Sequence, residues 1–164
     1  MGRIFKKGNW IIVKKVLFTA SSGGHFEQLM MLKDLINEYD SVVLTEKTKY
    51  KVNAYDAKLY TVCQINRKEL LFFFKFVYIF FKSLRIIIKE KPDVVISLGA
   101  LSTIPACVIM KMMRKKVIFI ESFAKIDSPT LTGKLVYKFA DLFLVQWESM
   151  KKYYPNAQCK GGLY

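Results

Sequence analysis

Cysteine and histidine are scarce in this sequence. Its three cysteines, Cys63, Cys107 and Cys159, are odd in number and widely separated, and the only histidine is His25. Such a set lacks the spacing of metal ligands, so we expect no metal site and interpret the cysteines as buried thiols in a reducing cytosol.

The sequence also lacks an uninterrupted apolar run near its start. Lys14 and Lys15 break the hydrophobic stretch, and no small-residue cleavage pattern precedes residue 20, which excludes a signal peptide. Residues 1–14 are therefore either a basic arm before the fold or an interfacial arm with Trp10, Ile11 and Ile12 as anchors.

Acidic residues are few. The 164-residue chain has 13 of them against 27 lysines and arginines, a formal net charge of +14. An excess of this size indicates an anionic partner, such as nucleic acid, anionic lipid or a phosphorylated substrate. The basic residues alternate with a strongly apolar stretch and no nucleic-acid recognition motif is present, so we expect no nucleic-acid partner.

Short apolar, β-branched runs alternate with helical stretches along the rest of the chain. The strand-like runs are 16–20, 41–46, 58–62, 93–99, 116–122 and 141–147; the expected helices are 26–38, 68–90, 102–113 and 132–139. Near-continuous apolar strands are typical of a parallel sheet covered on both faces. We therefore predict one α/β domain over residues 15–164, with a Rossmann-like parallel sheet.

The stretch SSGGH follows the first predicted strand and opens the first helix. Ligands collect at such strand ends in parallel sheets, so Ser21, Ser22, Gly23 and Gly24 are candidates for holding a diphosphate. The spacing is neither that of a dinucleotide-binding loop nor that of a P-loop, and an ordinary turn is the alternative. His25 is a candidate general base, kept neutral by the helix N-terminus, or else a capping residue.

Other polar residues are predicted at the same edge of the sheet. Glu121 and Ser122 end one strand, Gly99 ends another, and Thr132 lies at the start of a helix. We expect Gly99, Ser122 and Thr132 to contact the acceptor. Glu121 is either a second candidate for the base or a carboxylate that caps a neighbouring turn.

The predicted helix 68–90 combines a cationic stripe with many apolar side chains. Lys68, Lys75, Lys82, Arg85 and Lys89 fall on one narrow side at helical spacing. These charges oppose a bilayer crossing and favour a helix that lies in the interface of an anionic membrane. The predicted membrane residues are Phe73, Phe76, Phe80, Lys75, Lys82 and Arg85. The alternative is a helix that simply covers the sheet.

Four segments carry a family resemblance: SSGGHFEQL, KPDVVISLGA, FIESFAKIDSPTLTGKLVY and LFLVQWESMKKYYPNA. They resemble bacterial capsular and exopolysaccharide glycosyltransferase accessory subunits, and are similar to the membrane-anchoring subunit of the eukaryotic enzyme that adds the second N-acetylglucosamine to dolichol diphosphate. The resemblance extends over residues 15–164. Its Gly-Gly-His element corresponds to Gly23, Gly24 and His25, and its Glu-Ser element to Glu121 and Ser122.

The resemblance implies the amino-terminal, acceptor-binding half of a GT-B glycosyltransferase. The expected function is that of a membrane-associated subunit of a two-chain inverting enzyme, which transfers a sugar from a UDP-sugar to a polyprenyl-diphosphate saccharide in polysaccharide biosynthesis. A partner subunit would hold the UDP-sugar, this chain would bind no cofactor and would be inactive alone, and it would lie peripherally on the cytoplasmic face of the cell membrane. The alternative is a non-catalytic anchor and activator of the partner.

Overall fold

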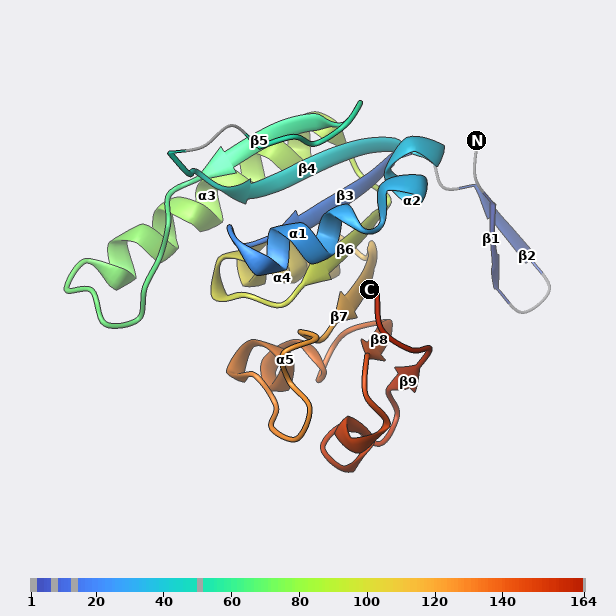
Figure 1. Ribbon diagram of the computed structural model, residues 1–164. Helices are drawn as coiled ribbons and strands as arrows, with labels where there is room; N and C mark the ends of the chain where they lie inside the picture. Colours follow the sequence, from blue (N-terminus) through green and yellow to red (C-terminus); the bar gives the residue numbers. More distant parts are fainter. Residues whose placement is uncertain (1–2, 7–8, 13–14, 50–51, 164) are drawn as a thin grey trace.

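A seven-stranded parallel sheet forms the centre of the protein (Figure 1). The computed structural model describes all residues except 1–2, 7–8, 13–14, 50–51 and 164. The strand order is β5-β4-β3-β6-β7-β8-β9. The strands are β3 (Lys15–Ala20), β4 (Asp40–Glu46), β5 (Lys58–Val62), β6 (Val94–Leu98), β7 (Lys116–Ile120), β8 (Leu142–Val145) and β9 (Gln158–Cys159). The predicted Rossmann-like parallel sheet is confirmed, with the short β9 as an additional strand.

The helices connect successive strands. They are α1 (Gly24–Met30), α2 (Lys33–Glu38), α3 (Phe72–Glu90), α4 (Ile104–Met112) and α5 (Leu131–Val136), with short 3-10 helices η1 (Leu101–Thr103) and η2 (Glu148–Lys152). The predicted helix 26–38 is divided into α1 and α2, and the predicted helix 68–90 begins four residues later than expected.

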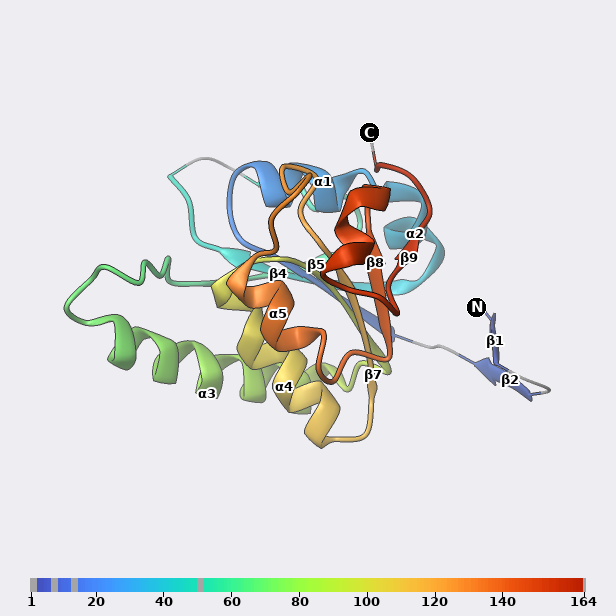
Figure 2. The ribbon, with the colours of Figure 1, turned by 90° about the horizontal axis from the view of Figure 1, so that it is seen from below.

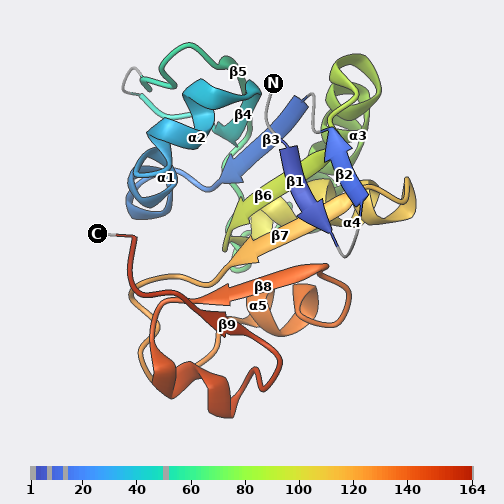
Figure 3. The same cartoon turned by 90° about the vertical axis from the view of Figure 1, so that its right-hand side faces the viewer.

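The helices cover both faces of the sheet. Figures 2 and 3 show α1 and α2 on one face and α3 and α4 on the other, with α5 beside α4 in Figure 2. Leu17 of β3 belongs to the core beneath α3 and α4, while its neighbour Phe18 belongs to the core beneath α1 and α2. Because both faces are buried, consecutive strand residues are apolar, which explains the continuous runs in the sequence.

The strand order reverses between β3 and β6. From β3 the chain moves outward through β4 to β5, and then returns to place β6 on the other side of β3. In open parallel sheets such a switch point leaves a crevice at the carboxyl ends of the two strands. The segments that follow β3 and β6 begin at Ser21 and Gly99, so both lie at this crevice.

The N-terminal segment forms a separate two-stranded antiparallel sheet. Its strands are β1 (Arg3–Lys6) and β2 (Asn9–Ile12), and β3 of the large sheet begins at Lys15. The interfacial role of Trp10, Ile11 and Ile12 stays a prediction.

Candidate functional site

The loop after β3 forms one wall of the crevice. Gly23 has φ +76°, a conformation that favours glycine, and precedes the first turn of α1. A side chain placed on Gly23 or Gly24 would meet no atom within 4 Å, so both glycines face open space. The loop therefore leaves room for a ligand to approach its backbone.

His25 is the second residue of α1 and is half-buried beside this loop. Its Nδ1 lies 3.2 Å from the hydroxyl oxygen of Ser21. Burial lowers the pKa of His25 below its ordinary value, and the charges of Glu121 and Glu46 offset part of this effect. The lowered pKa keeps the ring mainly neutral near pH 7, and burial is the largest cause of the shift.

Ser22 is hydrogen-bonded to Glu46, a residue that the sequence analysis did not single out. The backbone N–H and the hydroxyl of Ser22 both donate to Oε2 of Glu46, at 3.3 and 3.0 Å. Glu46 is buried at the end of β4, and Gln64 after β5 donates to the hydroxyl of Ser22. Both donors of Ser22 are therefore bonded to Glu46, although Ser22 also lines the hollow beside the glycine loop, and its role as a phosphate donor stays a prediction.

A basic hollow of about 690 Å³ opens beside the glycine loop. Its wall includes Gly23, Lys47 and Lys49 after β4, and Lys75 from the first turn of α3. Lys75 also forms an ion pair with Glu69. Lys47 and Lys49, together with Lys75 whose charge is partly offset by Glu69, give the hollow a net positive charge that favours an anion such as a diphosphate.

Glu121 lies inside the protein, only 1% exposed. Its carboxylate accepts hydrogen bonds from the N–H of Ser122, from the N–H and hydroxyl of Thr130, and from the hydroxyl of Tyr154 at 2.7 Å. Burial and this last bond raise the pKa of Tyr154. A carboxylate with this many donors, and without exposure to a substrate, joins two segments of the fold. The structure thus favours the turn-capping alternative over Glu121 as the base.

The segment after β7 is attached to α1 through Gln28. The Oε1 atom of Gln28 accepts hydrogen bonds from the N–H of Phe123 and from Nε2 of Gln146, both at 3.3 Å. The indole N–H of Trp147 donates to the carbonyl of Phe123 at 2.7 Å. These contacts fix the segment next to the helix that carries His25.

The other residues expected to contact the acceptor are mostly enclosed. Ser122 and Thr132 are both buried, and a side chain on Gly99 would come within 3.2 Å of the ring of Phe119. Burial leaves little exposed surface on Ser122 and Thr132, while Gly99 lies at the crevice against the ring of Phe119. Contact of these three residues with the acceptor stays a prediction.

The outward surface of α3 differs in detail from the predicted membrane face. Phe73 is 68% exposed, but Phe76 and Phe80 pack against the core. The other exposed phenylalanines of the helix are Phe74 and Phe81. The prediction of an apolar exposed surface holds for Phe73 and is wrong for Phe76 and Phe80, because those two lie on the side of α3 that carries the buried Ile79.

The exposed start of α3 lies at the same end of the molecule as the crevice. Figures 1 and 2 show the first turns of α3 extending past the carboxyl ends of the strands. In the part of the chain that the structure describes, no helix has both the length and the hydrophobicity needed to cross a membrane.

Solved structures show the class of protein to which this fold belongs. The chain is similar to MurG from Acinetobacter baumannii, with a TM-score of 0.69 and 18% identity over 83% of the chain and 42% of that structure. It is also similar to the UDP-N-acetylglucosamine 2-epimerase from Rickettsia bellii, with a TM-score of 0.71 and 11% identity over 93% of the chain and 46% of that structure. The fold is thus one Rossmann-like half of the GT-B class, and the chain spans less than half the length of either structure.

The family follows from the sequence as a whole. The profile described as "Oligosaccharide biosynthesis protein Alg14 like" matches residues 16–163, so the chain belongs to this family. The human "UDP-N-acetylglucosamine transferase subunit ALG14" is 25% identical over an alignment 171 residues long, gaps included, that spans 87% of this chain and 79% of the human protein. The subunit of the same name from Schizosaccharomyces pombe is 35% identical over 75 residues, 43% of this chain and 36% of the yeast protein.

These comparisons support one part of the resemblance noted in the sequence. The similarity to the eukaryotic transferase subunit is confirmed at the level of the family. The relatives named above are eukaryotic, and they do not support the capsular and exopolysaccharide part of the resemblance.

Proposed function

We propose that this chain is the membrane-associated, acceptor-binding subunit of a two-chain inverting glycosyltransferase. The observation that carries the proposal is the meeting of three features at one end of the sheet: half-buried His25, the basic hollow and the exposed apolar start of α3. A lipid-linked acceptor has three matching parts, which are a sugar hydroxyl, a diphosphate and a polyprenyl chain.

The acceptor would lie across this end of the sheet. Its diphosphate would occupy the hollow beside Gly23, near Lys47, Lys49 and Lys75, and its polyprenyl chain would stay in the bilayer next to the first turns of α3. The open space over the two glycines admits the diphosphate to the loop.

His25 would act as the general base through Nε2, the ring nitrogen that does not contact Ser21. When Nδ1 carries the proton and donates to Ser21, Nε2 has a free electron pair for the acceptor hydroxyl. The hydroxyl loses its proton to Nε2 as its oxygen bonds to C1 of the donor sugar. The bond between C1 and the UDP oxygen breaks on the opposite face, and UDP leaves with that electron pair. One such displacement inverts the configuration at C1.

A partner subunit would supply the UDP-sugar. Support comes from the relatives, whose names describe subunits of a UDP-N-acetylglucosamine transferase. UDP-N-acetylglucosamine is therefore the first donor to test. A role in capsular or exopolysaccharide synthesis, and a location on the cytoplasmic face of the membrane, are proposed from the sequence resemblance alone.

Reconstitution tests this function. The purified chain is mixed with UDP-N-acetylglucosamine and a polyprenyl-diphosphate sugar in vesicles, with and without a donor-binding subunit from the same cell. We expect transfer only when both subunits are present. Turnover by this chain alone would contradict the two-chain proposal. Full turnover by a complex whose His25 has been replaced would favour the non-catalytic anchor.

A further inference from the structure

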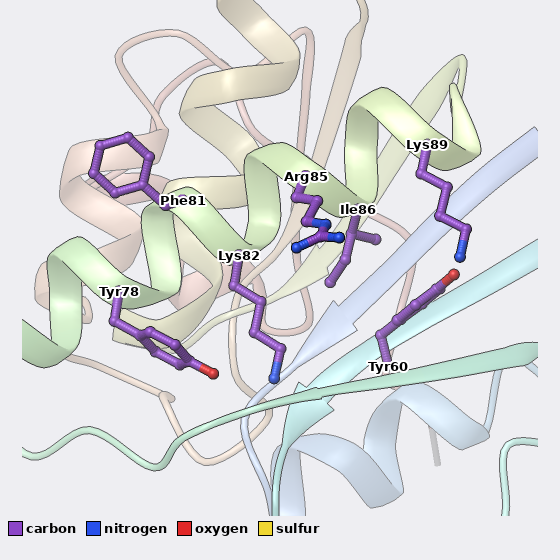
Figure 4. Close-up of a pocket in the computed structure, with 7 residues that line it drawn as sticks. All are labelled: Tyr60, Tyr78, Phe81, Lys82, Arg85, Ile86 and Lys89. Atoms are coloured by element: carbon purple, nitrogen blue, oxygen red, sulfur yellow. The ribbon is translucent and has the colours of Figure 1, made fainter.

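A second cationic feature lies along the outer flank of the molecule, away from the crevice. It is a groove of about 460 Å³ between the edge strand β5 and the second half of α3 (Figure 4). Its lining includes Tyr60 of β5 and, from α3, Tyr78, Phe81, Lys82, Arg85 and Lys89. Figure 4 shows Lys82 and Lys89 extending from the helix toward β5, with Arg85 between them.

The positive charge of this groove is not balanced by nearby acids. Across the described residues, no carboxylate forms an ion pair with Lys82, Arg85 or Lys89. The adjacent Glu90 is already occupied, because its carboxylate pairs with Lys15 and Lys58. Three cations gathered on one wall therefore form a site that attracts an anion.

The walls of the groove are held in place independently of any ligand. Tyr60 donates its hydroxyl hydrogen to Oε1 of Glu90 at 2.6 Å, and Lys58 Nζ lies 2.6 Å from the same oxygen. The bonds from Lys58 and Tyr60 lower the pKa of Glu90 to about 2, so this acid is ionised near neutral pH. The end of α3 is thus fastened to β5, and the ring of Tyr60 is fixed as the floor of the groove.

Apolar side chains border the cations directly. Phe81 and Ile88 are both more than half exposed beside Arg85, and Leu71, Phe74 and Tyr78 continue the exposed surface toward the start of α3. The outward surface of the helix is therefore mainly apolar in its first half and combines cations with exposed apolar side chains in its second half. An anion bound here would sit next to hydrocarbon, as the phosphate of a phospholipid does.

We propose that this groove binds the phosphate of an anionic phospholipid headgroup, with Lys82, Arg85 and Lys89 as its ligands. The inference rests on the proposed membrane association and specifies its lipid contact.

The headgroup contact also restricts the orientation of α3 on the membrane. Phe74 and Lys89 are about 22 Å apart along the axis at about 1.5 Å per residue. Interfacial helices insert by about 5–10 Å, so α3 would lie at a shallow inclination with its first turns deeper.

This orientation connects the groove to the candidate site. With the first turns of α3 in the bilayer, the carboxyl edge of the sheet and the loop at Ser21–His25 approach the membrane surface. The headgroup contact would hold the crevice where a lipid-linked diphosphate lies, without taking part in the transfer itself.

Vesicle binding tests the inference with the full chain. The variant Lys82→Gln/Arg85→Gln/Lys89→Gln is compared with wild type on phosphatidylcholine vesicles, with and without 20% phosphatidylglycerol. Each basic residue near an anionic surface contributes about fivefold, so we expect binding to the anionic vesicles to fall on the order of 100-fold. Binding to pure phosphatidylcholine should not change. The control, Lys33→Gln/Lys152→Gln/Lys160→Gln, removes the same charge from exposed positions outside α3 and should fall much less.

The outcomes separate the groove from simpler explanations. If both triple variants lose the same amount of binding to anionic vesicles, the effect is one of net charge alone. If the groove variant binds anionic vesicles as wild type does, the groove has no part in membrane binding. Either result overturns the inference. Inorganic phosphate is added at an ionic strength matched with sodium chloride, and displacement by phosphate alone would indicate a free-anion site rather than a lipid site. A failure of the proposed membrane association can be told apart from a failure of the groove inference, because wild type would then bind neither kind of vesicle.

Discussion

The hydroxyl oxygen of Ser21 lies 3.2 Å from Nδ1 of His25. Ser21 and His25 are four positions apart in sequence, and the turn at Gly23 brings Ser21, the first residue after β3, next to the first turn of α1. If Nδ1 donates to this oxygen, Ser21 fixes the tautomer that leaves Nε2 as a base. Ser21 would then be a positioning residue for His25 rather than an acceptor contact.

Replacement of Ser21 tests that role. We expect Ser21→Ala to lower the kcat of the complex by roughly 2- to 10-fold, the typical net worth of one hydrogen bond, with little change in KM. Ser21→Thr keeps the hydroxyl and should retain most of the activity. A loss confined to KM would instead return Ser21 to the acceptor-binding residues.

Gly133 and Glu121 provide a test of the buried carboxylate. A β-carbon on Gly133 would collide with Oε2 of Glu121 and with the hydroxyl of Tyr154. We expect Gly133→Ala to lower the free energy of unfolding by about 1–3 kcal/mol, as overpacking of a core does. Gly24→Ala is the control, because its side chain would enter open space and should cost far less. Denaturant unfolding of both variants measures the difference, and equal stabilities would show that Glu121 moves aside freely.

The two groups of phenylalanines on α3 should behave in opposite ways. Phe73→Ser/Phe74→Ser removes exposed rings and should release the chain from vesicles while leaving Tm nearly unchanged. Phe76→Ser/Phe80→Ser removes rings packed on the core and should lower stability by several kcal/mol. Vesicle flotation and thermal unfolding of each variant provide the measurements. The membrane prediction fails if the first variant still floats with the vesicles.

The pH dependence of stability should report the Glu90 cluster. The pKa of Glu90 in the folded protein is about 2, below its ordinary value of 4.5, so the folded state favours the ionised form. This stabilisation is present above pH 4.5 and is lost as the pH falls from about 4.5 toward 2. Glu90→Gln should remove on the order of 2 kcal/mol of stability at pH 7, and less at pH 3. A constant difference between wild type and variant over this range would contradict the low pKa.

Much of the fold was predictable because the apolar pattern of each strand in the sequence agrees with the burial of that strand in the sheet. The strand at Lys15–Ala20 is buried on both faces, so its residues had to be apolar without alternation, and that pattern is visible in the sequence. The break between α1 and α2 at Met31 and Leu32 was not predictable, since neither glycine nor proline marks it. The two-residue β9 is too short to leave a pattern.

The candidate site was predictable only in part. The loop Ser21–His25 could be located because it follows a strand and opens a helix. The bonds from Ser22 to Glu46 and from Tyr154 to Glu121 join residues 24 and 33 positions apart, and such partners depend on the order of strands in the sheet. The buried side of α3 includes Ser83, a small polar residue that the core encloses. The cationic stripe did not indicate that this side of the helix would be buried.

Turnover by the reconstituted complex that carries His25→Ala tests the central claim most directly. A general base typically contributes about 100- to 10,000-fold to a rate, whereas a packing histidine affects mainly stability. We predict a fall of at least about 100-fold in transfer to the lipid-linked acceptor, with Tm, vesicle binding and association with the donor subunit close to wild type. Near-normal turnover by a properly assembled complex would contradict the account and place the base on the partner subunit.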